Sequence, residues 1–109
     1  MRWIRALATA AALAVVPAAH AQNSGPIKIG VIFPMSGGAG PQGQALAQSI
    51  GAMAALINEA GGVLGRKVEL EVRDDESTPA VGVSRANELI SAGVSVIIEG
   101  WNSPVTLAM

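Results

Sequence analysis

The stretch that sets the architecture is Ile27-Lys28-Ile29-Gly30-Val31-Ile32-Phe33, a run rich in β-branched residues that Pro34 ends. Runs this short and this apolar are typical of buried strands rather than of helices. From residue 43 to residue 60 the apolar residues follow a helical spacing instead. The predicted inward stripe of this helix consists of Leu46, Ile50, Met53 and Ile57.

Two more strands and one more helix follow along the chain. Residues 68–72 alternate apolar and acidic side chains, which predicts a strand with one wet face at a sheet edge. Thr78 and Pro79 are an N-cap and a first helical residue, and this helix is expected to end near Gly93. Its expected inward residues are Val83, Ala86, Leu89 and Ile90, and its expected outward residues are Arg85 and Glu88.

Residues 94–98 are a third apolar run and predict a third strand. The order is therefore β-α-β-α-β, with connections long enough for parallel crossovers. We expect an α/β fold with a doubly wound parallel sheet. Ser103 and Pro104 repeat the cap-then-proline pattern, so a third helix is expected to begin there, five residues before the last residue, Met109. A helix this short is not stable alone. Residues 22–109 are therefore expected to be either the N-terminal part of a longer protein or a truncated gene product.

Composition excludes several classes of function. The chain has 109 residues, no cysteine and a single histidine, His20, so disulfides, thiolate metal sites and histidine-based catalytic triads are ruled out. A formal charge of -1 provides no basic surface for a phosphate backbone, so we expect no nucleic-acid partner. We also expect no metal, no cofactor and no enzymatic activity.

The first 21 residues have the pattern of a secretory signal peptide. Arg2 and Arg5 form a positive start, residues 6–16 are uncharged and apolar, and small residues occupy both positions before the expected cleavage after Ala21. A membrane anchor is the alternative, but the apolar run is about half of the roughly 20 residues that span a bilayer. The mature residues 22–109 are expected to be periplasmic.

Ligands of open parallel sheets bind beyond the carboxyl ends of the strands, where the winding direction reverses. If the first and third strands are neighbours, this point lies between residues 35–43 and residues 99–103. Ser103 is the expected N-cap of the third helix, whose backbone N–H groups favour an anion. Its hydroxyl either binds a ligand carboxylate or only caps its own helix. Trp101 either covers an apolar or cationic ligand group or seals the domain.

Two other motifs have competing interpretations. Residues 38–43 satisfy G-x-G-x-x-G, the dinucleotide fingerprint, but four residues separate them from the strand, and Asp74 lies 31 positions beyond Gly43 rather than about 20. An exported dehydrogenase is therefore disfavoured. Asp74, Asp75 and Glu76 suggest a metal, but adjacent residues of an extended chain point to opposite sides. Capping and solvation around the next helix is the expected role.

Three segments together resemble a known family. Ile27 to Val31 with Met35-Ser36-Gly37, then Ile57-Asn58-Glu59-Ala60-Gly61-Gly62-Val63-Leu64-Gly65-Arg66-Lys67-Val68-Glu69-Leu70, then Asp74-Asp75, resemble the amino terminus of periplasmic leucine/isoleucine/valine-binding proteins. The resemblance implies a type I periplasmic binding fold, in which two α/β lobes close on the ligand. It also implies a soluble, monomeric receptor of an ABC importer, with a permease as its partner and a branched-chain amino acid or similar small polar solute as its ligand.

The resemblance also assigns roles to single residues. Ser103 falls where the family's serine binds the amino acid α-carboxylate, and Gln42 falls where leucine-type receptors place an aromatic residue. Trp101 and Asn102 replace the small residues common before that serine. Together with Ser36, which lies among residues 35–43, these residues form the expected ligand-binding set. A sensory ligand-binding module of a membrane receptor is the alternative function, because the same fold serves both purposes.

Overall fold

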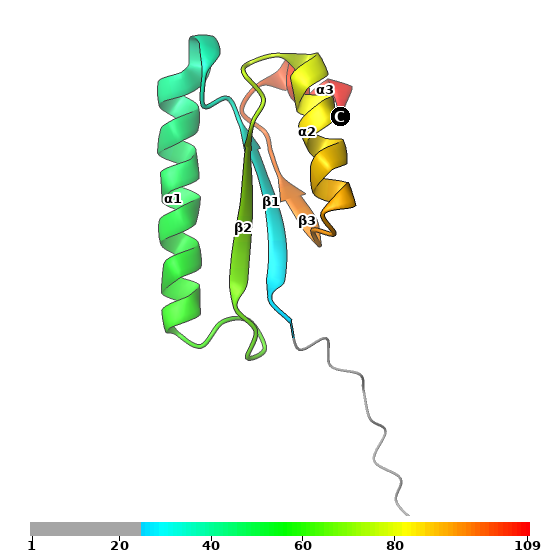
Figure 1. Ribbon diagram of the computed structural model, residues 1–109. Coiled ribbons are helices and arrows are strands. Elements are labelled where there is room, and N and C mark those ends of the chain that lie inside the picture. Colours follow the sequence, from blue (N-terminus) through cyan, green and yellow to red (C-terminus); the bar gives the residue numbers. More distant parts are fainter. Residues whose placement is uncertain (1–24) are drawn as a thin grey trace, which may run out of the picture.

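The computed structural model describes residues 25–109, and the predicted signal peptide lies outside the described residues. The chain alternates strands and helices in the predicted order (Figure 1). The strands are β1 (Ile27–Phe33), β2 (Val68–Asp74) and β3 (Val96–Ile98). The helices are α1 (Gly40–Glu59), α2 (Pro79–Ser91) and α3 (Ser103–Ala108), with a 3₁₀ turn, η1 (Gly37–Ala39), before α1.

The three strands form one parallel sheet in the order β2-β1-β3. β1 pairs with β2 from Ile27↔Val68 to Phe33↔Asp74, and with β3 from Ile29↔Val96 to Val31↔Ile98. Figure 1 shows the sheet between α1 on one side and α2 with α3 on the other. The arrangement confirms the predicted parallel sheet, the neighbouring first and third strands, and β2 as an edge strand.

The core is centred on the second half of β1. Val31 and Ile32 are fully buried, as is Leu89 of α2. α2 approaches the sheet closely at Gly30, where an added Cβ would lie 2.8 Å from Leu89 Cδ1. The prediction of β1 as a largely buried strand and of Leu89 as an inward residue is confirmed.

Element boundaries differ from the predictions at three places. α1 begins at Gly40 rather than at residue 43, because the preceding residues form η1 and lead directly into the helix. Pro41 is accommodated there because the first helical N–H groups have no intrahelical partner. β2 continues to Asp74, and β3 begins at Val96 rather than at residue 94.

Two predicted inward residues are exposed. Met53 of α1 is 58% exposed, while its neighbour Ala54 is buried. The cause is the closeness of α1 to β1: a Cβ on Gly43 would lie 2.5 Å from the carbonyl carbon of Pro34, so small residues line the contact and Met53 lies beside it. Ile90 of α2 is 65% exposed because Leu89, one residue earlier, takes the inward position.

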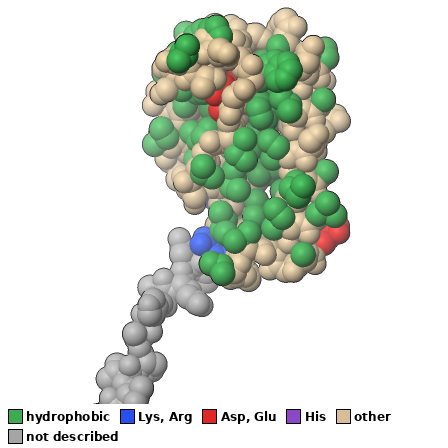
Figure 2. Space-filling view, turned by 180° about the vertical axis from the view of Figure 1, so that it is seen from behind, with side chains coloured by type: hydrophobic (Ala, Val, Ile, Leu, Met, Phe, Trp, Pro, Cys, Tyr) green, Lys and Arg blue, Asp and Glu red, His purple; other side chains and the backbone are tan. Residues whose placement is uncertain are grey.

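The outer edge formed by β3 is apolar. Val96 and Ile98 are 52% and 36% exposed, and β3 pairs only with β1 among the described strands. Figure 2, which shows the molecule from behind, has hydrophobic side chains over the middle of the view, from its upper to its lower end. Among residues 25–109, none of the helices is both long and apolar enough to cross a membrane.

Candidate functional site

Three connections meet at the carboxyl edge of the sheet, which is the upper end in Figure 1. The first loop (residues 35–39) joins β1 to α1, the acidic turn (residues 74–78) joins β2 to α2, and the third loop (residues 99–102) joins β3 to α3. The first and third loops follow neighbouring strands, so the winding direction reverses between them. The expected ligand-binding edge is therefore present.

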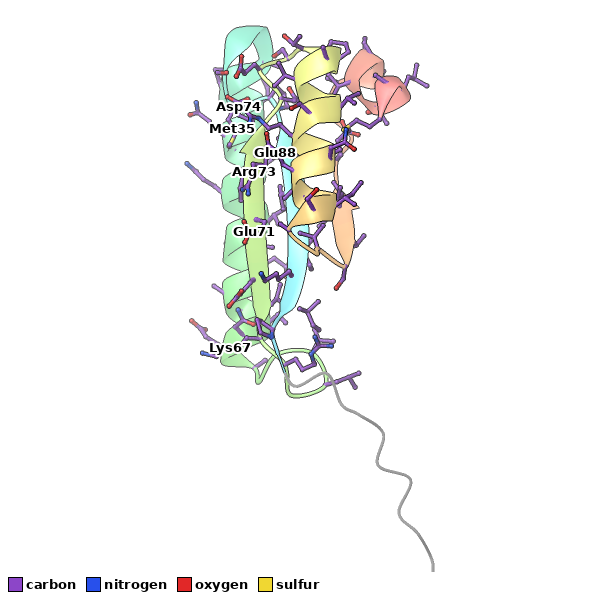
Figure 3. All side chains as sticks on the ribbon, turned by 45° about the vertical axis from the view of Figure 1, so that its right-hand side comes forward. Met35, Lys67, Glu71, Arg73, Asp74 and Glu88 are labelled. Carbon is purple, nitrogen blue, oxygen red and sulfur yellow. The ribbon has the colours of Figure 1, made fainter. Side chains whose placement is uncertain are left out.

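Asp74, the last residue of β2, holds the first loop through one carboxylate oxygen. Its Oδ1 accepts hydrogen bonds from the backbone N–H groups of Met35 at 2.8 Å and Ser36 at 3.3 Å. The same oxygen accepts the N–H of Glu76 at 2.8 Å. Figure 3 shows Asp74 and Met35 side by side at this end of the sheet.

The charge of Asp74 is stabilised by these donors. Partial burial raises the pKa of Asp74, but hydrogen bonds from the Ser36 side chain and from the N–H groups of Glu76, Met35 and Ser36 outweigh it. The pKa therefore lies below the ordinary value, because a carboxylate that accepts several hydrogen bonds favours its charged form. Asp74 is an anchoring acceptor for the first loop.

Ser77 forms a second link between the acidic turn and the first loop. Its Oγ donates a hydrogen bond to the carbonyl of Ser36 at 3.2 Å and accepts the N–H of Ala39 at 3.4 Å. Glu76 and Ser77 both have positive φ angles, 56° and 57°. Residues other than glycine rarely adopt this left-handed conformation, so the acidic turn is strained.

Asp75, the next residue, is fully buried. Its Oδ1 accepts the N–H of Ser77 at 2.7 Å, and its Oδ2 has no hydrogen-bond partner among the described residues. Burial raises the pKa of Asp75, the hydrogen bond from Ser77 opposes this shift, and the neighbouring Asp74 charge adds to it. The expected role of capping and solvation around α2 is wrong for Asp75. It bonds the N–H of Ser77, which precedes the N-cap Thr78, no side chain caps α2, and Asp75 is buried rather than solvated.

The two candidate residues on the α1 side are both exposed. Ser36 lies in the first loop, with its backbone held by Asp74 and Ser77. Gln42 lies on the first turn of α1. Of the G-x-G-x-x-G glycines, Gly43 packs against the backbone of Pro34, so its role here is helix packing.

The candidates on the β3 side are in and after the third loop. The expected N-cap role of Ser103 is wrong: Asn102 is the N-cap, and Ser103 is the first helical residue. Asn102 keeps an extended backbone, with φ -108° and ψ 101°, and its carbonyl accepts the N–H groups of Val105 and Thr106. Neither residue's side chain caps α3, and Ser103 is exposed. Trp101 is 48% exposed and does not seal the described domain.

The structure thus brings all five candidates to one edge of the sheet, in two groups on neighbouring strands. A cavity of about 270 Å³ lies at the opposite edge, beside Arg66 and Lys67, and contains none of them. Sequence reasoning missed the anchoring roles of Asp74 and Ser77. The sequence indicated only that Asp74 ends a strand expected beside β1, and it gave no sign of which backbone groups Asp74 and Ser77 would bond.

A parallel sheet with this strand order and these loops at one edge defines the class of open α/β domains that bind small molecules at the switch point. Residues 26–109 match the sequence profile of the periplasmic binding protein family. The chain belongs to that family, and its fold is the beginning of a type I periplasmic binding protein lobe.

A relative of known class is the Leu/Ile/Val-binding protein BraC3 of Rhizobium johnstonii, which is 38% identical over 97 residues. The match covers 89% of this chain and 25% of that protein. The chain therefore spans about a quarter of the length of the curated relatives it matches.

Solved structures give the same classification. The chain is similar to the fatty acid ABC transporter substrate-binding protein of Thermomonospora curvata, with a TM-score of 0.73, 32% identity, and coverage of 77% of this chain and 21% of that one. It is also similar to the branched-chain amino acid transporter substrate-binding protein LivJ of Streptococcus pneumoniae in complex with isoleucine. There the TM-score is 0.73 with 31% identity, and the coverage is 76% of this chain and 24% of that one.

Proposed function

We propose that this chain is the first part of a solute receptor of an ABC importer. The receptor captures a branched-chain amino acid or a similar small carboxylate or amide solute in the periplasm, as a monomer and without catalysing a reaction. Closure of two lobes around the solute shifts an open–closed equilibrium, and the permease in the inner membrane recognises the closed form. The observation that carries this proposal is the family match over residues 26–109.

The leader is part of the same proposal. Residues 1–21 act as a signal peptide that is removed after Ala21, and residues 22–109 follow in the periplasm. Removal of Arg2 and Arg5 leaves five basic and eight acidic residues, a formal charge of -3. Intact-mass measurement of the exported protein tests this step, since an amino terminus other than Gln22 contradicts it.

The proposed site is the space between the first and third loops. Ser103 contacts the solute carboxylate through its exposed hydroxyl, which is not used as a helix cap. Trp101, Asn102, Gln42 and Ser36 line the remainder. Support comes from the strand register, because the pair Val31↔Ile98 places the end of β3 beside β1, two residues before β1 ends at Phe33.

A grafted receptor tests the function. Residues 25–109 replace the matching segment of the Rhizobium johnstonii relative, and calorimetric titration measures binding of isoleucine, of its amide and of benzoate. The proposal expects one of these solutes to bind with a measurable heat. A folded graft that binds none of them contradicts the proposal.

The Ser103→Ala variant tests the carboxylate contact in the same graft. Loss of one charge-assisted hydrogen bond weakens binding by about 1 to 3 kcal/mol. Ser91→Ala is the matched control, because the Ser91 hydroxyl also lies on a helix but bonds the carbonyl of Asn87, at the far end of α2. Equal affinities of the two variants would remove Ser103 from the site.

A further inference from the structure

We propose that Asp74 and Ser77 are positioning residues that fix the first loop, and through it the part of the solute site that follows β1. The inference rests on the function proposed above and adds two residues that do not touch the solute. They act through the backbone of residues 35–39.

The first loop is held mainly from the acidic turn. Asp74 Oδ1 accepts the N–H groups of Met35 and Ser36, and Ser77 Oγ bonds the carbonyl of Ser36 and the N–H of Ala39. These four hydrogen bonds join residues 38 to 41 positions apart. Gly37 completes the contact, since a Cβ there would lie 2.9 Å from the carbonyl oxygen of Glu76. The first loop, which follows β1, and the acidic turn, which follows β2, are thereby held together at the candidate binding edge.

The acidic turn keeps a strained shape that makes these bonds possible. Glu76 and Ser77 both occupy the left-handed region, with φ 56° and 57°. Their N–H groups are held by the carboxylates of Asp74 and Asp75, at 2.8 and 2.7 Å. Strain that the surrounding contacts maintain is found preferentially at ligand-binding sites. Here the left-handed conformation of Glu76 and Ser77 places the Ser77 hydroxyl within hydrogen-bond distance of the first loop.

This arrangement has two effects on a solute. A loop fixed before binding loses less conformational entropy when the solute arrives, which strengthens binding. In addition, the N–H groups of Met35 and Ser36 are already bonded to a negative charge. A solute carboxylate is therefore directed away from the first loop and towards the third loop, where Ser103 lies.

The first experiment measures amide hydrogen exchange in the full 109-residue chain. Asp74→Ala removes the two hydrogen bonds that the first loop donates to a charged acceptor, together with the one from Glu76. Exchange over residues 35–39 is therefore expected to accelerate at least about tenfold. Ser77→Ala is expected to accelerate it less. The matched control is Asn58→Ala, which removes bonds of 2.8 and 2.9 Å between the Asn58 side chain and the backbone of Val68. It breaks the same kind of contact at the other end of β2.

The second experiment titrates isoleucine and benzoate into the grafted receptor. Asp74→Ala is expected to weaken binding at least about fivefold. The affinity of Asp74→Asn is expected to lie between those of the unsubstituted graft and Asp74→Ala, because the asparagine side-chain oxygen still accepts hydrogen bonds. Asn58→Ala is expected to change binding less than about twofold.

The two proposals fail in different ways. If the folded graft binds neither solute, the receptor function fails and this inference falls with it. If the graft binds but Asp74→Ala and Asn58→Ala weaken binding equally, only the positioning role is overturned. Unchanged exchange over residues 35–39 in Asp74→Ala overturns it as well.

Discussion

Replacing Gly43 with alanine is expected to lift the start of α1 away from β1. The new Cβ would overlap the carbonyl oxygen of Pro34 and lie 2.5 Å from its carbonyl carbon. Restoring an ordinary contact of 3.4 Å with the carbon alone requires a movement of about 0.9 Å, and the overlapping oxygen, which is nearer, requires more. Both partners are backbone, so no side chain can rotate out of the way. Overpacking of this kind costs up to about 3 kcal/mol, and the better helix propensity of alanine returns about 1 kcal/mol.

The expected net effect is a loss of about 2 kcal/mol in the free energy of unfolding. Gly51→Ala is the control, because Gly51 lies in the same helix and an added Cβ there meets nothing within 4 Å. That variant is expected to gain about 1 kcal/mol. Urea unfolding of the full chain, followed by far-ultraviolet circular dichroism, measures both. If Gly43→Ala is as stable as Gly51→Ala, the close approach of α1 to Pro34 is refuted.

Three further substitutions test other features. Leu64 is 96% exposed with φ 51°, so Leu64→Gly is expected to raise the urea midpoint by relieving up to about 1 kcal/mol of strain; a lower midpoint contradicts this. The pKa of Asp75 is raised, so the stability that its protonated carboxyl contributes is lost as pH rises through its folded-state pKa. Asp75→Asn should therefore be more stable at pH 7, and its free energy of unfolding should vary less with pH above 3.8. A steeper variation of that free energy contradicts the argument. A Cβ on Gly82 would overlap Val105, so Gly82→Ala is expected to speed amide exchange in α3, and unchanged exchange speaks against that contact.

Most of the fold follows from local patterns. The β-branched run of β1 and the alternation in β2 predict strands, and Thr78 with Pro79 predicts the start of α2 at the observed residue. Periodicity defines a helix face but not the line of closest contact. The exposure of Met53 was therefore missed, because that line depends on the approach of Gly43 to Pro34.

The candidate site was predictable in position but not in detail. Strand order places residues 36 and 103 at the same edge, whereas the choice between Asn102 and Ser103 as N-cap depends on one backbone conformation that both residue types favour. The anchoring by Asp74 was missed because its hydrogen bonds reach backbone groups 38 and 39 positions away. Any residue type at Met35 or Ser36 supplies the same N–H group, so the sequence carries no complementary signal.

The two edge strands of the sheet, β2 and β3, differ in how readily they would pair with a further strand. β2 carries charged side chains at Glu69, Glu71 and Arg73. Charged residues on an edge strand disfavour pairing with another strand. β3 carries no charged residue: Val96 and Ile98 are exposed, and on its outer side β3 pairs with no other strand among residues 25–109. Within residues 25–109, β3 is therefore the edge that favours pairing with a further strand, and β2 is the edge that disfavours it.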